Sequence, residues 1–219
     1  MIPLRDINPR RRFPIVTLLI ILMNVIVFAY EWMLTPAALD RLAFTWGLIP
    51  AQLMTFRLEA IVRVFTSMFL HGGLMHLAGN MLYLWIFGDN VEGAMGSFSY
   101  LVFYLLCGIG AAIGQVAVGP SSTVPMIGAS GAISGVLGAY LVLYPGAQVE
   151  TLLFVGFFVR LVRLPALVLL GMWILLQFVS GLASLGIDVT GGVAFFAHVG
   201  GFVAGVALVG LFRRRRWWD

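Results

Sequence analysis

Charged residues and cysteine are scarce in this sequence. Only 10% of the 219 residues are charged, whereas 61% are hydrophobic and the mean hydropathy is +1.03. A soluble domain of this size leaves much of its chain surface in water and cannot hide so much apolar surface. The composition therefore excludes an ordinary soluble domain and predicts a membrane protein. The single cysteine, Cys107, excludes an internal disulfide.

Lysine is absent, so all thirteen basic residues are arginines. Seven of them form clusters near the two ends, at Arg10–Arg12 and Arg213–Arg216. Arginine clusters beside apolar spans favour the cytoplasmic side, which predicts that both ends are cytoplasmic. Trp217-Trp218 after the second cluster suits an anchor at an anionic inner leaflet. The basic residues thus indicate orientation and do not indicate a nucleic-acid partner.

Long apolar stretches predict an all-α membrane protein with six spans in a single domain over residues 1–219. The predicted spans are approximately 13–34, 70–88, 99–118, 130–144, 165–183 and 193–212. An even number agrees with two cytoplasmic ends. The first stretch is too long for a signal-peptide core and no small-residue cleavage site follows it, so we expect a retained span.

Two segments between the spans carry charges that decide their interpretation. Asp89, Glu92 and Gly96 are expected to end the second span. Val149–Leu164 contains Glu150 and two arginines, and its apolar run is too short to cross a bilayer. This segment predicts either a surface hairpin or an interfacial helix.

Polar residues inside apolar spans are costly and are therefore the informative ones. His76 and Asn80 lie in the early turns of the second span, Ser130 opens the fourth, and His198 lies early in the sixth. All three spans run from the outside inwards, so these groups fall in the same outer half of the bilayer. Ser130 to Tyr144 gives roughly 22 Å of helix at about 1.5 Å per residue, roughly 8 Å less than the hydrocarbon thickness. Ser130 is therefore expected below the outer surface, in a pocket that water reaches.

Close approach of the fourth and sixth spans would create a nucleophile. Their glycines recur at helical spacing, at Gly131, Gly135 and Gly138 in one span and at Gly201 and Gly205 in the other. Small residues at such spacing let membrane helices pack closely. If these faces meet, the His198 imidazole can take the proton of the Ser130 hydroxyl. The Asn80 amide, a His76 N–H and the Ser130 backbone N–H are suitable donors for an oxyanion. Asp188, the nearest carboxylate in sequence, lies in the preceding loop, which favours a Ser-His dyad over a triad.

The order and spacing of these residues resemble the rhomboid family of intramembrane serine proteases over nearly the whole chain. The matching motifs are Gly128-Ala129-Ser130-Gly131, His76-x3-Asn80, Ala197-His198-x2-Gly201-x3-Gly205 and Glu92-x3-Gly96-Ser97. The resemblance implies a six-helix bundle that cleaves single-pass transmembrane proteins within or near their membrane segment, without a cofactor or metal. It also implies substrate access from the lipid between the second and fifth spans.

Carried over by position, the resemblance makes Ser130 the nucleophile and His198 the general base. It places His76, Asn80 and the Ser130 amide at the oxyanion, with Gly128 shaping their loop. With no appended soluble domain or seventh span in view, the resemblance favours a minimal prokaryotic inner-membrane enzyme over an organellar one, with a site that opens to the extracytoplasmic side. The substrate, its cleavage motif and the oligomeric state are left open.

This chain departs from the family pattern at two positions. Arg63 resembles the arginine of a Trp-Arg pair in the first loop, but Val62 stands where that tryptophan would be. Many members hold the catalytic imidazole against an aromatic residue one turn after the serine, and Ser134 occupies that position here. The resemblance therefore does not say what orients the His198 ring.

Three other interpretations compete with a protease. A pseudoprotease would bind transmembrane helices without cutting them, although the serine and histidine are intact. A small transporter or channel would also carry polar groups in its spans, but no inverted repeat is visible. A metal site could use His71, His76 and His198, yet His71 and His76 are poorly spaced for one helix face. We expect His71 to be structural, tying the first loop to the second span.

Overall fold

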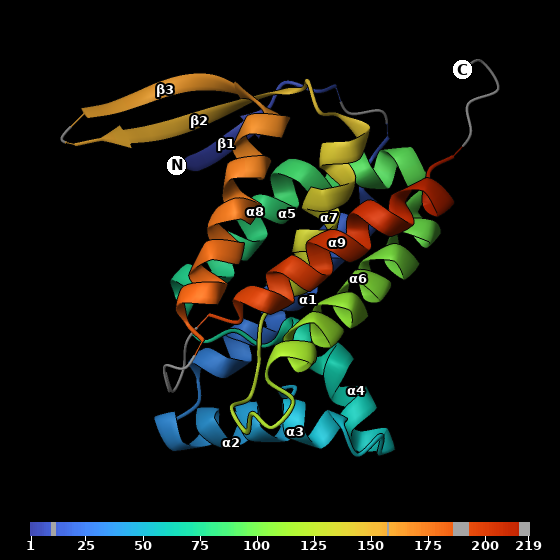
Figure 1. Cartoon of the computed structure of the whole chain (residues 1–219), viewed down its shortest axis with the longest axis vertical. Helices are drawn as coiled ribbons and strands as arrows, with labels where there is room; N and C mark the ends of the chain where they lie inside the picture. Colours follow the sequence, from blue (N-terminus) through green and yellow to red (C-terminus); the bar gives the residue numbers. More distant parts are fainter. Residues whose placement is uncertain (10–11, 157, 186–192, 215–219) are drawn as a thin grey trace.

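Helices make up most of the chain, with a small β-sheet at one end (Figure 1). The computed structural model describes residues 1–9, 12–156, 158–185 and 193–214. The long helices are α1 (Ile15–Trp32), α5 (Leu74–Met95), α6 (Ser97–Val118), α7 (Ser130–Leu143), α8 (Ala166–Ala183) and α9 (Phe195–Phe212). Between α1 and α5 lie α2 (Pro36–Trp46), α3 (Pro50–Leu53), α4 (Leu58–Thr66) and the 3-10 helix η1 (Ser67–Phe69). The described residues do not include Arg10, Arg11 and residues 215–218, on which part of the predicted orientation depends. They also do not include Asp188, on which the preference for a dyad over a triad depends.

Four helices of the described chain are long and apolar enough to cross a membrane, namely α1, α6, α8 and α9. Helix α5 meets the same test only together with α4 and η1, from which it is bent by 84°. Helix α7 is apolar but shorter, with 14 residues. The apolar helices together make the chain an integral membrane protein.

Helix α5 is longer than the sequence predicts at its C-terminal end. Asp89 and Glu92 do not end it, and it stops only at Gly96, whose φ of +84° favours glycine. Glu92 is tolerated because its carboxylate accepts hydrogen bonds from the backbone N–H groups of Val16 (3.0 Å) and Thr17 (2.8 Å). These are free donors at the start of α1, so the acidic side chain caps another helix instead of breaking its own.

Helix α7 lies at the centre of the bundle. Its residues 131–140 are all buried, and it packs against α5, α6 and α9. Tyr140 of α7 is fully buried and packs edge-on against Phe87 of α5, with ring centroids 4.9 Å apart. A polar group at the start of this helix is therefore surrounded by protein.

The loop before α7 is fixed by backbone hydrogen bonds to the segment that follows α1. Leu48 and Met126 form an antiparallel bridge, with N···O distances of 3.0 and 2.7 Å. The N–H of Gly128 donates to the carbonyl of Ser67 at 2.8 Å. In Figure 1 the elements α2, α3 and α4 lie at the end of the bundle opposite the sheet. The start of α7 is thus held from that end.

A three-stranded antiparallel sheet corrects the expectation of an all-α chain. Its strands are β1 (Ile2–Asp6), β2 (Gln148–Val155) and β3 (Phe158–Pro165), in the order β1-β2-β3. Of the two alternatives for residues 149–164, the hairpin is the one that forms. Strand β1 was not predicted, because five residues with one proline carry no clear alternation. It forms by pairing with β2, from Ile2 opposite Leu152 to Asp6 opposite Val149.

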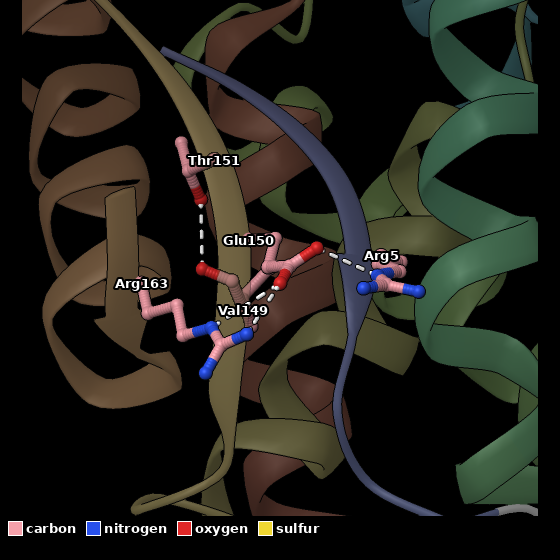
Figure 2. Close-up of polar contacts among 5 residues, drawn as sticks. All are labelled: Arg5, Val149, Glu150, Thr151 and Arg163. Carbon is pink, nitrogen blue, oxygen red and sulfur yellow. Dashed lines mark hydrogen bonds and ion pairs between the residues drawn. The ribbon is translucent and has the colours of Figure 1, made fainter. Parts of the chain in front are cut away.

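Polar contacts hold β1 to the hairpin and to the bundle. Figure 2 shows Glu150 of β2 between Arg5 of β1 and Arg163 of β3, at 2.6 and 3.0 Å. The Asp6 carboxylate accepts from the Tyr140 hydroxyl at 2.7 Å and from the Asn90 amide at 2.8 Å. The N-terminal strand is therefore linked to both α5 and α7.

We expect Glu150→Gln to loosen β1. The hydrogen bond from Arg5, with further contributions from Arg163, keeps the pKa of Glu150 below its ordinary value of 4.5. Because the pKa of Glu150 is lower in the folded state, its ionised carboxylate stabilises the folded protein. This stabilisation is complete above the ordinary pKa and is lost as the pH falls through the lowered, folded-state pKa. The protection of the amides in residues 2–6 against hydrogen exchange, taken relative to the intrinsic rate at each pH, should therefore fall in the variant at neutral pH and in the wild type only in acid. Glu59→Gln, an exposed site on α4, is the control; equal exchange in all three proteins at neutral pH would contradict the prediction.

Candidate active site

Ser130 and His198 meet where α7 and α9 come together. The His198 Nε2 atom lies 2.7 Å from the Ser130 Oγ atom, which is hydrogen-bonding distance. His198 is buried, with 9% of its surface exposed, and Ser130 is partly buried as the first residue of α7. Two residues that are 68 positions apart in sequence thus form a nucleophile–base pair in geometry.

Glycine contacts bring the two helices together, as the spacing predicted. A Cβ atom on Gly201 would lie 1.9 Å from the carbonyl oxygen of Gly131, and one on Gly205 would lie 2.0 Å from that of Gly135. Helix α9 therefore rests with its backbone directly on the backbone of α7. This part of the prediction is confirmed, and it explains how Ser130 comes so near to His198.

Helix α8 orients the imidazole, which the sequence did not reveal. The His198 Nδ1 atom lies 2.7 Å from the Gln177 Oε1 atom, and the Trp173 ring lies against the imidazole at 5.8 Å between centroids. An Nδ1–H that donates to the amide oxygen leaves Nε2 unprotonated and free to accept from Ser130. Gln177 is the only amide side chain in the predicted span 165–183, so a polar residue among apolar ones was the available signal.

Ser134 does not replace the missing aromatic residue. Its hydroxyl donates back to the Ser130 carbonyl at 2.6 Å, so it bonds within its own helix. The ring against His198 comes instead from Trp173, on another helix. Arg63 donates to the side-chain oxygen of Gln52, which keeps it within the loop that follows α1.

His76 and Gly128 lie against each other beside Ser130. Gly128 has a φ of +124°, and a Cβ atom there would be 2.7 Å from the Cε1 and Nε2 atoms of the His76 ring. Both backbone conformation and space therefore require glycine. The Gly72 N–H donates to His76 Nδ1 at 3.4 Å, so the proton of a neutral ring resides on Nε2, the atom that faces Gly128. The predicted donor on His76 thus points towards the loop that leads into Ser130.

The Asn80 side chain forms a hydrogen bond with His71, which is part of a structural network. Its Nδ2 atom lies 2.9 Å from His71 Nε2, and the backbone N–H of His71 donates to both carboxylate oxygens of Glu31 at 3.2 Å. One Asn80 N–H is thereby used, while the amide keeps a second. His71 joins the end of the first loop to α5, as expected, and Glu31 of α1 completes the link. Glu31 is the only acidic residue in the predicted first span, and this isolated charge was the available signal for its role.

A small cavity adjoins Ser130. Its volume is about 40 Å³, and its lining includes Ser67, Met68, Gly108, Gly128 and Ser130. A water molecule needs roughly 10–15 Å³ of such volume, so the cavity can hold water but not a peptide segment. A substrate would therefore require a separate opening of the site.

Chemically, the arrangement combines a nucleophile, a base and donors for a developing negative charge. The N-terminus of α7, which has no side-chain cap, points its free N–H groups and positive dipole end to the region around Ser130. Within the described residues, no group of three or more histidine, cysteine or acidic side chains could hold a metal ion. The geometry suits attack on a carbonyl carbon.

Comparisons with known proteins point to one family. The family model described as the Rhomboid domain matches residues 58–215. Rhomboid protease GluP of Bacillus subtilis (strain 168) is 47% identical over 79 residues, which cover 36% of this chain and 15% of that protein. Rhomboid protease AarA of Providencia stuartii is 32% identical over 155 residues, covering 63% of this chain and 55% of that protein. RHOMBOID-like protein 4 of Arabidopsis thaliana is 32% identical over 146 residues, which cover 67% of this chain and 32% of that protein. The chain therefore spans 15–55% of the lengths of these three relatives.

Proposed function

This chain belongs to the rhomboid family, and we propose that it is an intramembrane serine endopeptidase that uses a Ser130–His198 dyad. The observation that carries the proposal is the 2.7 Å contact between Ser130 Oγ and His198 Nε2. Two relatives are named rhomboid proteases, which supports the same activity. The whole of residues 1–219 is proposed to be a single protease domain.

In the proposed reaction, Ser130 Oγ attacks the scissile carbonyl carbon while His198 Nε2 takes its proton. The Nδ1–H stays with Gln177, which stabilises the imidazolium that forms. The oxyanion is stabilised by the Ser130 N–H, the His76 Nε2–H and the second N–H of Asn80. The tetrahedral intermediate then collapses: its C–N bond breaks as His198 gives its proton to the leaving amine, which leaves an acyl-enzyme on Ser130. In the second half, His198 takes a proton from the water that attacks the acyl carbon and returns it to Ser130 Oγ as the carboxylic acid leaves.

The proposed topology has six spans, α1, α5, α6, α7, α8 and α9, with both ends of the chain in the cytoplasm. Helix α7 has 14 residues, or roughly 21 Å at about 1.5 Å per residue, whereas the hydrocarbon core is about 30 Å thick. Its first residue, Ser130, would then lie below the extracytoplasmic surface. We also propose a location in the inner (plasma) membrane of a prokaryote, on the basis of the resemblance to a minimal rhomboid protease.

The proposed substrates are single-pass membrane proteins that reach the site laterally between α5 and α8. Tyr83 of α5 and Trp173 of α8 contact each other, with ring centroids 6.4 Å apart, and Trp173 also covers the imidazole. Parting of this ring contact would open a path from lipid to His198. A covalent cross-link between α5 and α8 should block a membrane-embedded substrate; undiminished cleavage would contradict lateral access.

The proposed activity is tested by purifying the wild type in detergent and treating it with a fluorescent fluorophosphonate. We expect one covalent label, found by mass spectrometry on the peptide that contains Ser130. In parallel, the protein in liposomes should cleave a single-pass substrate. A folded wild type that binds a transmembrane helix but neither labels nor cleaves would overturn the proposal and leave a pseudoprotease.

We expect Gln177→Leu to lower kcat by about 10- to 100-fold with little change in KM. The variant leaves the Nδ1–H of His198 buried without an acceptor, which costs about 1–3 kcal/mol, and it frees the ring to adopt the wrong tautomer. Gln177→Glu keeps an acceptor of the same length and should restore most of the activity. Leu176→Ala, on the exposed side of α8, is the matched control. A loss in the leucine variant that glutamate does not restore would indicate a purely structural role.

A further inference from the structure

The end of the β2–β3 hairpin exposes a cluster of apolar side chains. This hairpin tip comprises Phe154, Phe158, Val159 and Leu161, which are 54–72% exposed. Antiparallel pairing places Phe154 opposite Val159, with Leu161 beside them on the same face, whereas Phe158 lies on the other face. Both faces of the tip are therefore apolar, unlike a sheet that has one face in water.

The position of the tip follows from the buried base of the hairpin. Val149 and Thr151 of β2 are fully buried against the bundle, and the alternation of the strands puts Phe158 and Arg160 on the same face as these two residues. In Figure 1 the hairpin extends sideways from the N-terminal end of α8, past the edge of the bundle. This face of the hairpin packs on helices at the base of the hairpin. At the tip, the same face lies beside α8 and beyond the edge of the bundle.

After Glu150, the only charged side chains of the hairpin sequence are basic. Residues 151–165 contain two arginines and no acidic residue. Arg163 is held by Glu150, together with Arg5, near the base of the sheet (Figure 2). Arg160 lies nearer the tip, opposite Leu153, and is exposed. An apolar tip with an exposed arginine matches the chemistry of an anionic lipid surface.

We propose that the hairpin tip inserts into the headgroup region of the bilayer beside α8, with Arg160 at anionic lipid phosphates. Helix α8 begins at Ala166, directly after β3 ends at Pro165, so the hairpin leaves the bundle where an apolar span starts. At that depth the surroundings of a laterally projecting segment are lipid. The open backbone edge of β3 is acceptable there because headgroups and interfacial water can bond to it, which the hydrocarbon core cannot.

Such insertion would anchor the start of α8, the helix that carries Trp173 and Gln177. The inference depends on the chain being a membrane protein and not on its proposed catalysis. A second copy of the chain and a partner protein are the other possible occupants of the tip. The lipid surface is favoured because it is present wherever α8 crosses the bilayer, and because the arginine complements its charge.

The test uses fluorescence in liposomes. Cys107, the only cysteine, is buried, so Phe158→Cys can be labelled selectively with a polarity-sensitive fluorophore, and the wild type reports background labelling. Gln148→Cys, at the exposed base of the same hairpin, is the matched control. We expect lipids spin-labelled near the headgroup to quench the label at 158 strongly and the label at 148 weakly. Equal quenching at the two positions would overturn the proposal.

Two further measurements test for a second copy of the chain at the tip and for a preference for anionic lipid. Quenching that changes with the protein-to-lipid ratio would indicate a second copy of the chain and would overturn lipid insertion. The ratio of quenching by spin-labelled phosphatidylglycerol to that by spin-labelled phosphatidylcholine measures the preference for anionic lipid. Arg160→Gln should reduce this ratio by up to about fivefold, the effect of one arginine near an anionic surface. An unchanged ratio would remove Arg160 from the proposal.

Discussion

Ser130→Ala is expected to reduce cleavage of a transmembrane substrate by about six orders of magnitude, the loss seen when the nucleophile is removed from a soluble serine protease. Among the described residues, Ser130 is the only one whose hydroxyl is hydrogen-bonded to His198 Nε2, so the base has no second nucleophile to activate. Covalent labelling by a fluorophosphonate should disappear with the activity. The measurement is single-turnover cleavage in liposomes, with labelling read on a gel.

The fold should survive this substitution, because the hydroxyl makes one hydrogen bond and leaves the glycine contacts of α7 intact. His198→Ala should reduce activity by a similar factor, and the double variant should be no worse than either single one, since the two residues act as a unit. Ser134→Ala is the matched control: it removes a hydroxyl from the same helix that bonds only to backbone. Substantial cleavage by the Ser130→Ala protein would exclude Ser130 as the nucleophile.

The residues that we propose to react could be picked out from the sequence because polar side chains are unusual in segments that face lipid. His76, Ser130 and His198 each stand in an apolar stretch, where an ionisable or hydroxyl side chain needs a reason to be present. The glycine spacing of α7 and α9 then indicated which helix faces meet, and the backbone contacts agree with it. Periodicity and burial cost were enough for this part of the site.

The groups that orient those residues were harder to predict because they act through tertiary contacts. Gln177 and Trp173 lie on a helix that no motif connects to His198, and their relevance appears only when α8 is packed beside α9. Glu31 likewise acts on His71 across 40 positions. Single polar residues in apolar spans were visible, but a sequence gives no distance by which to choose a partner for them.

Element boundaries failed where a side chain was satisfied by a distant segment. Asp89, Glu92 and Gly96 were expected to end the second span, yet the helix continues past Glu92 because the start of α1 supplies hydrogen-bond donors for its carboxylate. Strand β1 was missed for a related reason, since five residues become a strand only by pairing with β2. In both cases a partner more than 70 residues away, which the local sequence does not reveal, determined the structure.

Gly201→Ala is expected to lower kcat by about 100-fold, although no atom of Gly201 takes part in the proposed chemistry. The added carbon would lie 1.9 Å from the Gly131 oxygen, and side-chain carbons keep at least 3.0 Å from other heavy atoms, so α7 and α9 must separate locally by about 1.1 Å. Gly131 directly follows Ser130, and Gly201 lies three residues after His198, so the separation lengthens the Ser130–His198 contact. A displacement of about 1 Å can cost roughly 100-fold in rate.

Gly210→Ala supplies the control on the same helix, because a Cβ atom there meets nothing within 4 Å. Both substitutions raise helix propensity equally, by about 0.5–1 kcal/mol, so they differ only in what the new methyl group contacts. We expect Gly210→Ala to keep wild-type activity while Gly201→Ala loses both cleavage and fluorophosphonate labelling. Accumulation of each protein in the membrane and its thermal unfolding are measured alongside, since lost packing also lowers stability. If Gly201→Ala folds and cleaves like the Gly210→Ala control, the close contact between α7 and α9 does not position the dyad.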